Sequence, residues 1–180
     1  NSSDFGVPQL RPRVAIVAGR PEYWRHFAFP APSKSKPPTV GETLVDLMAA
    51  DGWQGATAWA ATANEVAPTI VGGSKKHGGP DLGPSRARAA WAKLGVNGKT
   101  VAEHPPEPGF ADMPRLTPRM VARLQGFPDD WHFTGRKTQS YKQVGNAFPP
   151  PVAKALGLAI RQAILAAEAL TCLPVGLAAE

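Results

Sequence analysis

Two short motifs between residues 115 and 151 constrain the fold more than any other part of the sequence. In the first motif, Thr117 can accept a backbone N–H as the N-cap of a helix, and Pro118 suits the first helical position. Gly126 stands where a left-handed residue ends a helix, and Pro128 prevents the helix from continuing. We therefore expect a short helix between Thr117 and Gly126 with both of its ends specified.

The second motif, residues 140–151, places a Gly145-Asn146 turn directly ahead of a last helix. The start of that helix is set by Pro150 or Pro151. Apolar residues then recur at helical spacing. They are Val152, Leu156, Ala159, Ile160, Ala163, Ile164 and Ala167.

Composition favours a folded, basic protein. The chain has 180 residues, of which 43% are hydrophobic, and this is enough for one domain or for a small domain plus part of another. Twenty Pro and 18 Gly imply long irregular connections. The net charge of +6 favours an anionic partner, with nucleic acid as the first candidate. Many small proteins are basic without such a partner, so charge leaves both alternatives open.

Several classes of protein are excluded or disfavoured. One Cys excludes a disulfide framework and a Cys-rich zinc site, and the four His lack metal-ligand spacing, so no metal is predicted. No apolar run approaches the roughly 18 residues of a membrane span, and no signal peptide is visible. We predict a cytoplasmic protein. Because the sequence opens with Asn1 in a loop that enters a strand, we also expect an excised or processed piece.

The N-terminal region carries one apolar run. Val14–Ala18 is closed by Gly19, and its length and β-branched content predict a strand buried on both faces, as in a parallel sheet. The sequence supplies few other strands of this type. We therefore expect the chain to form the edge of a larger structure.

Two further helices are expected in the middle of the chain. Thr39 and Glu42 have the spacing of a capping box, and the helix that they open should end at Gly52. Residues 84–95 predict a second helix, stopped by Gly95. Residues 21–38 have the composition of a linker, and residues 67–79 form a Gly-rich loop with two Lys.

Taken in order, these motifs resemble the C-terminal part of DNA cytosine-C5 methyltransferases. Gln9-Leu10-Arg11-Pro12-Arg13 is similar to the eighth motif of that family, Arg115–Trp131 to the ninth, and Gln143–Asn146 to the tenth. The resemblance implies an α/β fold, as a fragment of a Rossmann-like S-adenosylmethionine-dependent methyltransferase domain. It also implies a small, irregular target-recognition domain and a long C-terminal helix.

The resemblance further implies three parts of the chain. Residues 1–20 would end the catalytic domain with the strand of the eighth motif, and residues 21–112 would form the target-recognition domain. Residues 113–180 would carry the ninth and tenth motifs and the helix that returns to the catalytic domain.

The departures from the family pattern concern the chemistry. The Pro-Cys-Gln motif of the nucleophile, the Glu-Asn-Val motif and the Gly-rich cofactor loop have no counterpart in the sequence, and Cys172 lacks the nucleophile's context. Met120 stands where the ninth motif commonly has Glu, which would complete a capping box with Thr117. We expect this change to cost about 0.5–1 kcal/mol of local helix stability and to leave the chemistry unaffected.

The reaction that the resemblance implies transfers a methyl group from S-adenosylmethionine to C5 of a cytosine that has left the duplex. Arg13 would donate to O2 of the flipped base, and Arg11 would brace the pocket or reach a phosphate. Alternatively, both are surface charges at the entry to a strand. Gly145, Asn146 and Ala147 would close a cofactor pocket shared with the missing N-terminal half. A turn at a helix N-terminus suits a carboxylate, although an ordinary turn between helices would look the same.

Contacts with double-stranded DNA are expected from the basic region between the eighth and ninth motifs. Lys suits phosphates, and Arg can also read guanine. The candidates are Lys75, Lys76, Arg86 and Arg88, with Ser74, His77 and Ser85 as secondary ones. For each of them a solvated surface position is an equal alternative. Trp91 and Leu94 are expected in the core, and Arg119 and Arg123 are expected to support the recognition region.

The leading hypothesis is therefore the C-terminal part of a cytosine-C5 methyltransferase, inactive without an N-terminal half or subunit that carries the nucleophile. A second hypothesis is a non-catalytic, sequence-specific DNA-binding or regulatory module derived from such an enzyme. A third is an RNA-binding protein that stacks bases on Trp24, Phe27 and Phe29, although these aromatic residues could equally pack within the protein.

Overall fold

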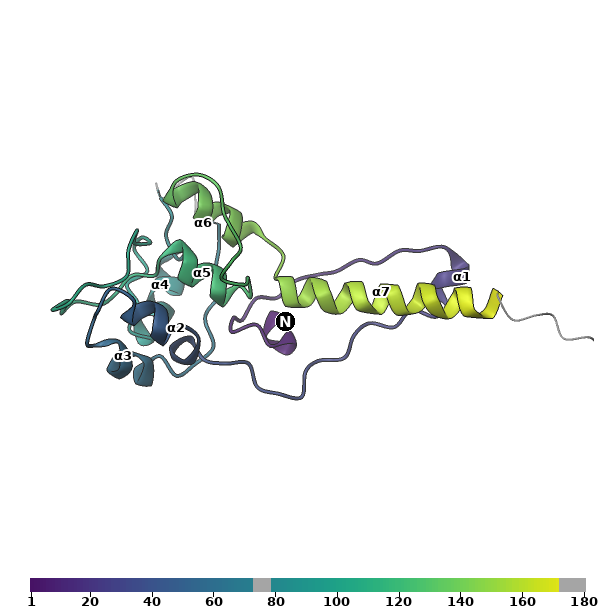
Figure 1. Cartoon of the computed structure of the whole chain (residues 1–180), viewed down its shortest axis with the longest axis horizontal. Coiled ribbons are helices and arrows are strands. Elements are labelled where there is room, and N and C mark those ends of the chain that lie inside the picture. Colours follow the sequence, from purple (N-terminus) through teal and green to yellow (C-terminus); the bar gives the residue numbers. More distant parts are fainter. Residues whose placement is uncertain (73–78, 172–180) are drawn as a thin grey trace, which may run out of the picture.

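The computed structural model describes residues 1–72 and 79–171 as a cluster of short helices from which one long helix extends (Figure 1). The elements in chain order are η1 (Ser2–Phe5), α1 (Pro21–Trp24), α2 (Val40–Ala49), α3 (Ala56–Thr62), α4 (Ser85–Lys93), α5 (Pro118–Leu124), α6 (Lys137–Asn146) and α7 (Pro150–Thr171). None of the helices in these ranges is long and apolar enough to cross a membrane.

The capping signals in the sequence define two of these helices as expected. In α2 the Thr39 hydroxyl accepts the backbone N–H of Glu42 at 3.2 Å, while the Glu42 carboxylate accepts that of Thr39 at 2.7 Å. These bonds from Thr39 lower the pKa of Glu42. In α5 Thr117 is the N-cap, and Gly126 follows the last turn with a φ of 86°. Both predicted helices are confirmed.

Met120 takes the place of the expected acidic residue in α5 without leaving the cap open. Its sulfur lies 3.3 Å from the backbone nitrogen of Thr117 and accepts its N–H, and its side chain is fully buried. Sulfur is a weak acceptor, so the bond itself is modest. Burial of the thioether adds a core contact that a Glu would not make.

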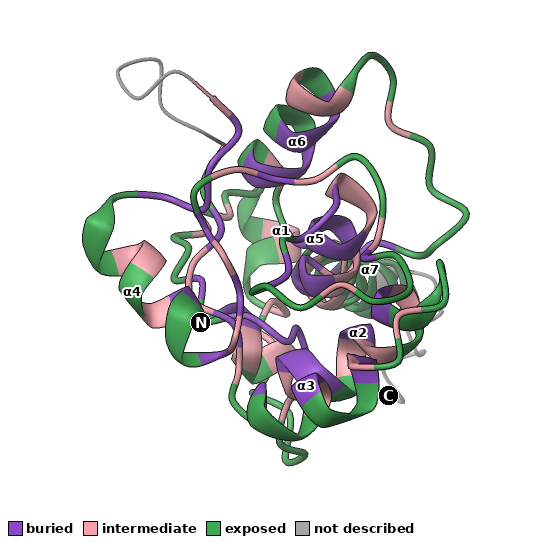
Figure 2. Cartoon of the chain, turned by 90° about the vertical axis from the view of Figure 1, so that its left-hand side faces the viewer, coloured by how far each residue is buried: buried purple, intermediate pink, exposed green. Residues whose placement is uncertain are grey.

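Helices α2 to α6 share one apolar core (Figure 2). Its helical members include Val40, Leu44 and Met48 of α2, Trp59 of α3, Trp91 of α4, Met120, Val121 and Leu124 of α5, and Tyr141 and Val144 of α6. Trp91 and Leu94 are buried, as predicted, and Gly95 follows α4 with a φ of 66°. Helix α5 packs against both α2 and α6, so it lies at the centre of the cluster.

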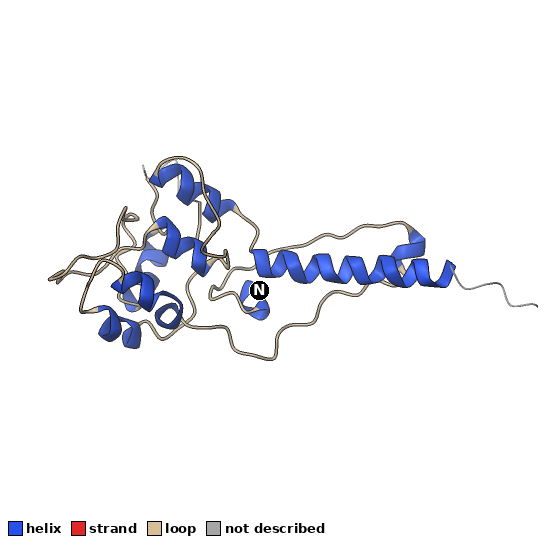
Figure 3. Cartoon of the chain, viewed as in Figure 1, coloured by secondary structure: helices blue, strands red, loops and turns tan. Residues whose placement is uncertain are grey.

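The predicted strand over Val14–Ala18 is wrong for this structure. Among the described residues no β-strand is present (Figure 3), and Val14 and Ile16 are 86% and 90% exposed. An isolated bridge nearby pairs Gln9 with Ala67 in parallel orientation. A strand needs a neighbour to pair its backbone N–H and C=O groups. Residues 14–18 form no strand pair with any described segment and are irregular in this structure.

Helix α7 begins at Pro150, as predicted, and projects away from the cluster (Figure 1). Among the described elements it packs against η1 and α1. Val152, Ala163 and Ala167 of its predicted stripe are buried, whereas Ile160 and Ile164 remain 38% and 37% exposed. The stripe is therefore only partly covered.

Two smaller expectations are corrected. The segment predicted as a linker contains the four-residue helix α1, whose Trp24 ring stacks on Phe27 at 5.3 Å between ring centroids. Gly145 and Asn146 lie in the last turn of α6 and do not form a turn at the start of α7; helix α6 ends at its C-cap, Ala147. The argument for a carboxylate site at a helix N-terminus therefore does not apply to them.

Candidate functional site

A chain of buried side-chain amides joins the three motifs. Gln9 accepts the backbone N–H of Ile70 at 2.7 Å and donates to the side-chain oxygen of Gln125. Gln125 in turn donates to the carbonyls of Val144 at 3.0 Å and Ala147 at 3.1 Å. Both Gln side chains are fully buried. The eighth, ninth and tenth motifs thus meet in one connected polar cluster.

Arg11 makes a second connection between the backbone at Ile70 and the backbone at the end of α6. Its guanidinium donates to the carbonyls of Ile70, Gly145 at 2.6 Å and Ala147 at 3.4 Å. Its backbone is held by the first turn, because its N–H donates to the side chain of Asn1 and its carbonyl accepts from the Ser2 hydroxyl at 2.8 Å.

The charge of Arg11 is buried without a carboxylate against it. Its side chain is 1% exposed, and none of the ion pairs among the described residues includes it. Burial, followed by repulsion from Arg13, lowers the pKa of Arg11 to about 10. Its Nε atom has no hydrogen-bond partner in this part of the chain. Arg11 therefore braces three backbone carbonyls here and is not placed to reach a phosphate.

A close backbone contact also joins residues 70–72 to residues 144–147. We call these two segments, with the Gln9, Arg11 and Gln125 side chains that connect them, the junction. A Cβ atom built on Gly145 would lie 2.5 Å from the Cα of Gly72, closer than real Cβ atoms approach other atoms. The segment that leaves Ile70 and the last turn of α6 can touch in this way only because both positions are Gly. Gly145 is buried, whereas the neighbouring Asn146 is exposed and Ala147 is half-buried.

Arg13 lies on the open side of this junction. Its side chain is exposed and borders a cavity of about 240 Å³ between the eighth-motif segment and the start of α7. The cavity is lined by Asn1, Ser2, Phe5, Arg13, Ala15, Phe29, Pro30, Phe148, Val152 and Leu156. The two Arg of the eighth motif thus have different surroundings, one buried in backbone carbonyls and one at a cavity.

The predicted DNA contacts fall into three groups. Lys75 and Lys76, with Ser74 and His77, lie outside the described residues. Arg86 is exposed on α4. Arg88 is half-buried; its guanidinium lies 3.3 Å from the Ser85 hydroxyl, and its stem packs against Gly98. Among the predicted basic contacts that the structure describes, Arg86 is the exposed one, and Ser85 is exposed beside it.

Comparison with known proteins decides the family. Residues 1–162 match the family model of the C-5 cytosine-specific DNA methylases. The chain belongs to this family.

Two relatives match over most of the chain. The type II methyltransferase M.NaeI of Lentzea aerocolonigenes is 61% identical over 91% of the chain, and the type II methyltransferase M.NgoMIV of Neisseria gonorrhoeae is 46% identical over 91%. The matches cover 40% and 52% of those proteins, so this C-5 methylase chain spans about half of their length or less. A shorter match, 53% identical over 26% of the chain, is to the mouse DNA (cytosine-5)-methyltransferase 1. No solved structure shows significant similarity to the chain.

Arg123 of the methylase chain connects the ninth-motif helix to α2. Its guanidinium donates to the carboxylate of Asp46 at 2.5 Å, to the carbonyl of Thr43 at 3.1 Å, and to the carboxylate of Asp129. These hydrogen bonds from Arg123 lower the pKa of both Asp residues. Arg119 instead holds the loop that follows α5, through the carbonyls of Pro128 and Trp131.

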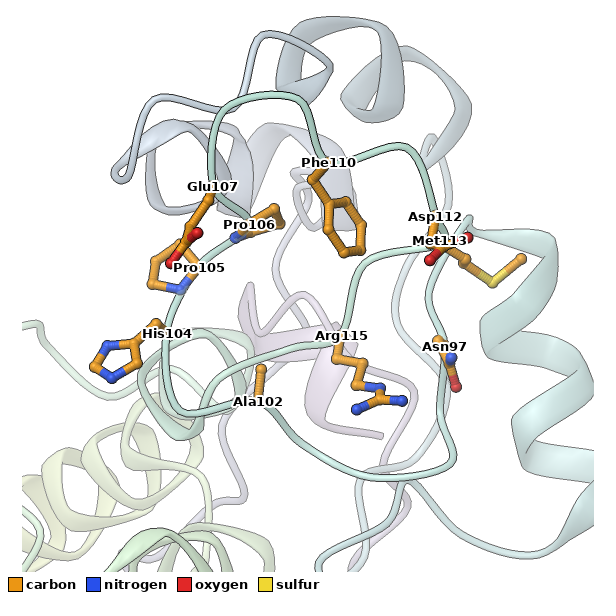
Figure 4. Close-up of a pocket in the computed structure, with 10 residues that line it drawn as sticks. All are labelled: Asn97, Ala102, His104, Pro105, Pro106, Glu107, Phe110, Asp112, Met113 and Arg115. Atoms are coloured by element: carbon orange, nitrogen blue, oxygen red, sulfur yellow. The ribbon is translucent and has the colours of Figure 1, made fainter.

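One cavity of the methylase chain was not expected from its sequence. It has a volume of about 680 Å³ and lies inside the Pro-rich segment 97–115, with Arg115 at one side and Phe110 at the other (Figure 4). Trp53 fixes this segment by donating to the carbonyl of Phe110 at 2.8 Å. The Pro-rich composition of residues 103–113 by itself predicts only an irregular connection between elements.

Two further polar residues are buried, namely Gln125, which the sequence did not single out, and Tyr141, whose sequence position suited either a pocket or simple packing. Gln125 occupies the C-cap of α5, and Tyr141 donates from its hydroxyl to the carbonyl of Asp81 at 2.6 Å. Burial raises the pKa of the Tyr141 phenol. Helical periodicity places both residues on core-facing positions, and a polar residue at such a position is the signal that could have identified them as buried hydrogen-bonding groups.

Proposed function

We propose that the chain is the C-terminal target-recognition and cofactor-pocket-closing part of a DNA cytosine-C5 methyltransferase. It would act on a specific duplex site after the target cytosine has left the stack. The observation that carries the proposal is the meeting of the three motifs in one buried polar cluster, with Arg13 and Asn146 exposed beside it.

Each exposed side chain has a chemical role in this proposal. Arg13 would donate a hydrogen bond to O2 of the flipped cytosine, where a fixed positive charge stabilises the electron density that builds up on the ring. S-adenosylmethionine, when bound, supplies the methyl group. The side-chain amide of Asn146 can both donate and accept hydrogen bonds. Because Ala147 presents its carbonyl to Arg11 and Gln125, residues 145–147 would form only one wall of the cofactor pocket.

The rest of the methyltransferase domain would cover the exposed apolar surface. We propose that residues 14–18 add a strand to a Rossmann-like sheet, since Val14 and Ile16 carry apolar side chains that stand in solvent here. Leu158, Leu165 and Leu170 on α7 are 46–57% exposed and provide further apolar surface that such a domain could cover. In this division residues 1–20 and 113–180 belong to the catalytic domain, and residues 21–112 recognise DNA.

Double-stranded DNA would lie against the basic region. Arg86 is exposed on α4 for a phosphate or a guanine, and the Gly-rich loop adds Lys75 and Lys76 in sequence. The charge of +6 supports this assignment, because Lys and Arg that neutralise phosphates supply most non-specific affinity.

A chimera tests the proposal. The portion of the Lentzea relative that the match leaves uncovered would be joined to this chain, because the resemblance implies that it carries the Pro-Cys-Gln nucleophile. We expect the purified chimera to transfer labelled methyl groups from S-adenosylmethionine to cytosine in duplex DNA, and this chain alone to transfer none. A chimera that is folded but labels no cytosine in any sequence context contradicts the proposal.

A second candidate is a DNA-binding or regulatory module without catalysis, favoured by the net charge of +6 and by Arg86, which is exposed on α4. It predicts that the chain alone binds one duplex site at least tenfold tighter than unrelated duplexes, with affinity that falls steeply with salt. An inactive chimera together with such binding would favour this candidate over the enzyme.

A further inference from the structure

The Pro-rich segment 97–115 is fixed at both of its ends. Backbone hydrogen bonds join its first and last residues, among them one from the N–H of Asn97 to the carbonyl of Pro114 at 2.8 Å. At its tip, Trp53 donates to the carbonyl of Phe110, and the two rings pack edge to face with 5.9 Å between their centroids. The cavity of about 680 Å³ therefore lies inside a segment with a defined backbone path.

Arg115 brings to this cavity a charged group that the described protein does not use. Its side chain is exposed, and in the described part of the chain its guanidinium takes part in no hydrogen bond or ion pair. The other two Arg of the ninth motif, Arg119 and Arg123, are bound to carbonyls and carboxylates. Asn97 lines the same cavity (Figure 4), and its amide oxygen accepts the N–H of Lys99 at 3.2 Å, which leaves its NH₂ group as a donor.

The cavity also carries negative charge. Glu107 and Asp112 line it, both are exposed, and neither forms an ion pair with Arg115 in the structure as described. A phosphate would be attracted by the guanidinium and repelled by the two carboxylates. A neutral ligand that offers both acceptors and donors suits this combination better. The edge of a base pair in the major groove of DNA is a ligand of that kind.

The cavity has a fixed position relative to α4. A Cβ atom built on Gly98 would lie 3.2 Å from the Cγ atom of Arg88, so the segment packs against the side of this helix. The carbonyl of Gly98 also accepts the N–H of Leu82 at 3.1 Å. Helix α4 carries the exposed Arg86. A duplex that contacts Arg86 therefore meets the cavity at a defined place.

We propose that Arg115 and Asp112 determine sequence specificity by reading one G·C pair of the duplex. The Arg115 guanidinium donates to O6 and N7 of the guanine, and the Asp112 carboxylate accepts from the N4 amino group of the paired cytosine. This inference rests on the proposed function. It goes beyond it by naming the base pair that is read, and by extending recognition past residue 112 into the ninth motif.

The experiment uses the chimera described above. A pool of duplexes of randomised sequence is methylated for a short time and read by bisulfite sequencing, which gives the relative methylation rate for each base at each position around the target cytosine. The variants are Arg115→Ala, Arg115→Gln and Asp112→Ala. Arg161→Ala on α7 and Asp51→Ala after α2 are the matched controls, because both residues are exposed and neither lines the cavity. Thermal midpoints are recorded so that every assay is made well below unfolding.

We expect the base preference to change at one position only. In Arg115→Ala the preference for guanine at that position should fall by about fivefold to 150-fold, the discrimination that one bidentate contact provides. Asp112→Ala should relax the same base pair, by a smaller factor. Arg115→Gln should favour adenine there, because a Gln side chain can form two hydrogen bonds with N6 and N7 of adenine. Both controls should keep the pattern of the unmodified chimera.

Two results would overturn the inference while leaving the proposed function intact. One is a rate that falls equally on all sequences in Arg115→Ala, since a phosphate contact or a structural role would act in this way. The other is an unchanged base preference in Asp112→Ala, or a change at a separate position. A folded chimera that methylates no cytosine overturns the proposed function, and with it this inference, so the two kinds of failure are distinguished.

Discussion

Helix α5 and the segment 14–18 both carry apolar residues, but those of α5 are buried and those of the segment are exposed. Helix α5 is enclosed by α2 and α6, and its Leu124 is fully buried. Ile16 in the other segment is 90% exposed. The difference shows that an apolar pattern predicts burial of a segment but does not identify which part of the molecule buries it. In α5 the cover lies within this chain; for residues 14–18 we propose that it lies elsewhere in the enzyme.

The sharpest test of this comparison replaces one residue in each region by Ala. Leu124→Ala should lower the free energy of unfolding by about 2–5 kcal/mol, the usual cost of a large-to-small change in a core. Ile16→Ala should change it by less than about 0.5 kcal/mol in this chain, as at most surface sites. Urea titration followed by circular dichroism measures both.

In the chimera the second result should change. If residues 14–18 become a covered strand, Ile16→Ala should there cost about 2–5 kcal/mol, while the cost of Leu124→Ala stays the same. An Ile16→Ala chimera as stable as the unmodified one would place the cover of this segment outside the methyltransferase domain.

The next largest effect concerns the backbone contact at the junction. Gly145→Ala introduces a Cβ atom 2.5 Å from the Cα of Gly72, and overpacking of this kind costs about 1–3 kcal/mol. Gly157→Ala on α7 is the matched control, since a Cβ there meets no atom within 4 Å. It should stabilise the helix by up to about 1 kcal/mol. Equal thermal midpoints for the two variants would contradict the close contact.

A smaller effect is expected at the link between α5 and α2. Arg123→Met removes hydrogen bonds to Asp46 and Asp129, which are 62% and 53% exposed, so solvent screening limits the loss to about 1 kcal/mol. Because Arg123 lowers the pKa of both carboxyl groups below 3.8, its contribution is complete above that pH and is lost as pH falls through the lowered values. The difference in thermal midpoint between the two proteins should therefore shrink below about pH 4.

Part of this difference should survive in acid. The hydrogen bond from Arg123 to the carbonyl of Thr43 does not depend on the carboxyl groups. A midpoint difference that is constant from pH 7 to pH 2.5 would assign the whole effect to this bond and to packing.

The smallest effect is expected for a single DNA contact. Arg86→Ala in the chimera should reduce the slope of log affinity against log salt by about one, as for the loss of one phosphate contact. Lys154→Ala removes an exposed charge from α7, away from the recognition region, and should leave the slope unchanged. Identical slopes for the two variants would remove Arg86 from the interface.

The sequence predicted the helices whose ends are chemically marked. Thr117 and Gly126 define α5 because capping and positive φ are local requirements. The strand at 14–18 could not be decided locally, since a strand exists only with a neighbour. Asn146 was predicted to lie in a turn directly ahead of α7, but it lies in the last turn of α6. The prediction was wrong because α6 continues through Gly145, although Gly has a low helix propensity.

The candidate site was predictable only as motifs. Arg11 and Arg13 are two residues apart and chemically identical in sequence, yet one is buried and the other borders a cavity. That distinction depends on the carbonyls of Ile70 and Gly145, which are distant in sequence from Arg11. The hydrogen bond between Gln9 and Gln125 likewise joins residues that are distant in sequence, and no local pattern predicts it.

One property of the contacts at Ile70 bears on how such proteins diversify. Gln9 and Arg11 form hydrogen bonds only with the backbone N–H and C=O of Ile70. Every amino acid except proline offers both groups. These two hydrogen bonds therefore do not depend on the side chain at position 70, although the Ile70 side chain is buried in the core and position 72 has no space for a Cβ atom. A foreign recognition segment could be grafted after this point, provided that its first residues return the same two groups and that Gly72 is kept.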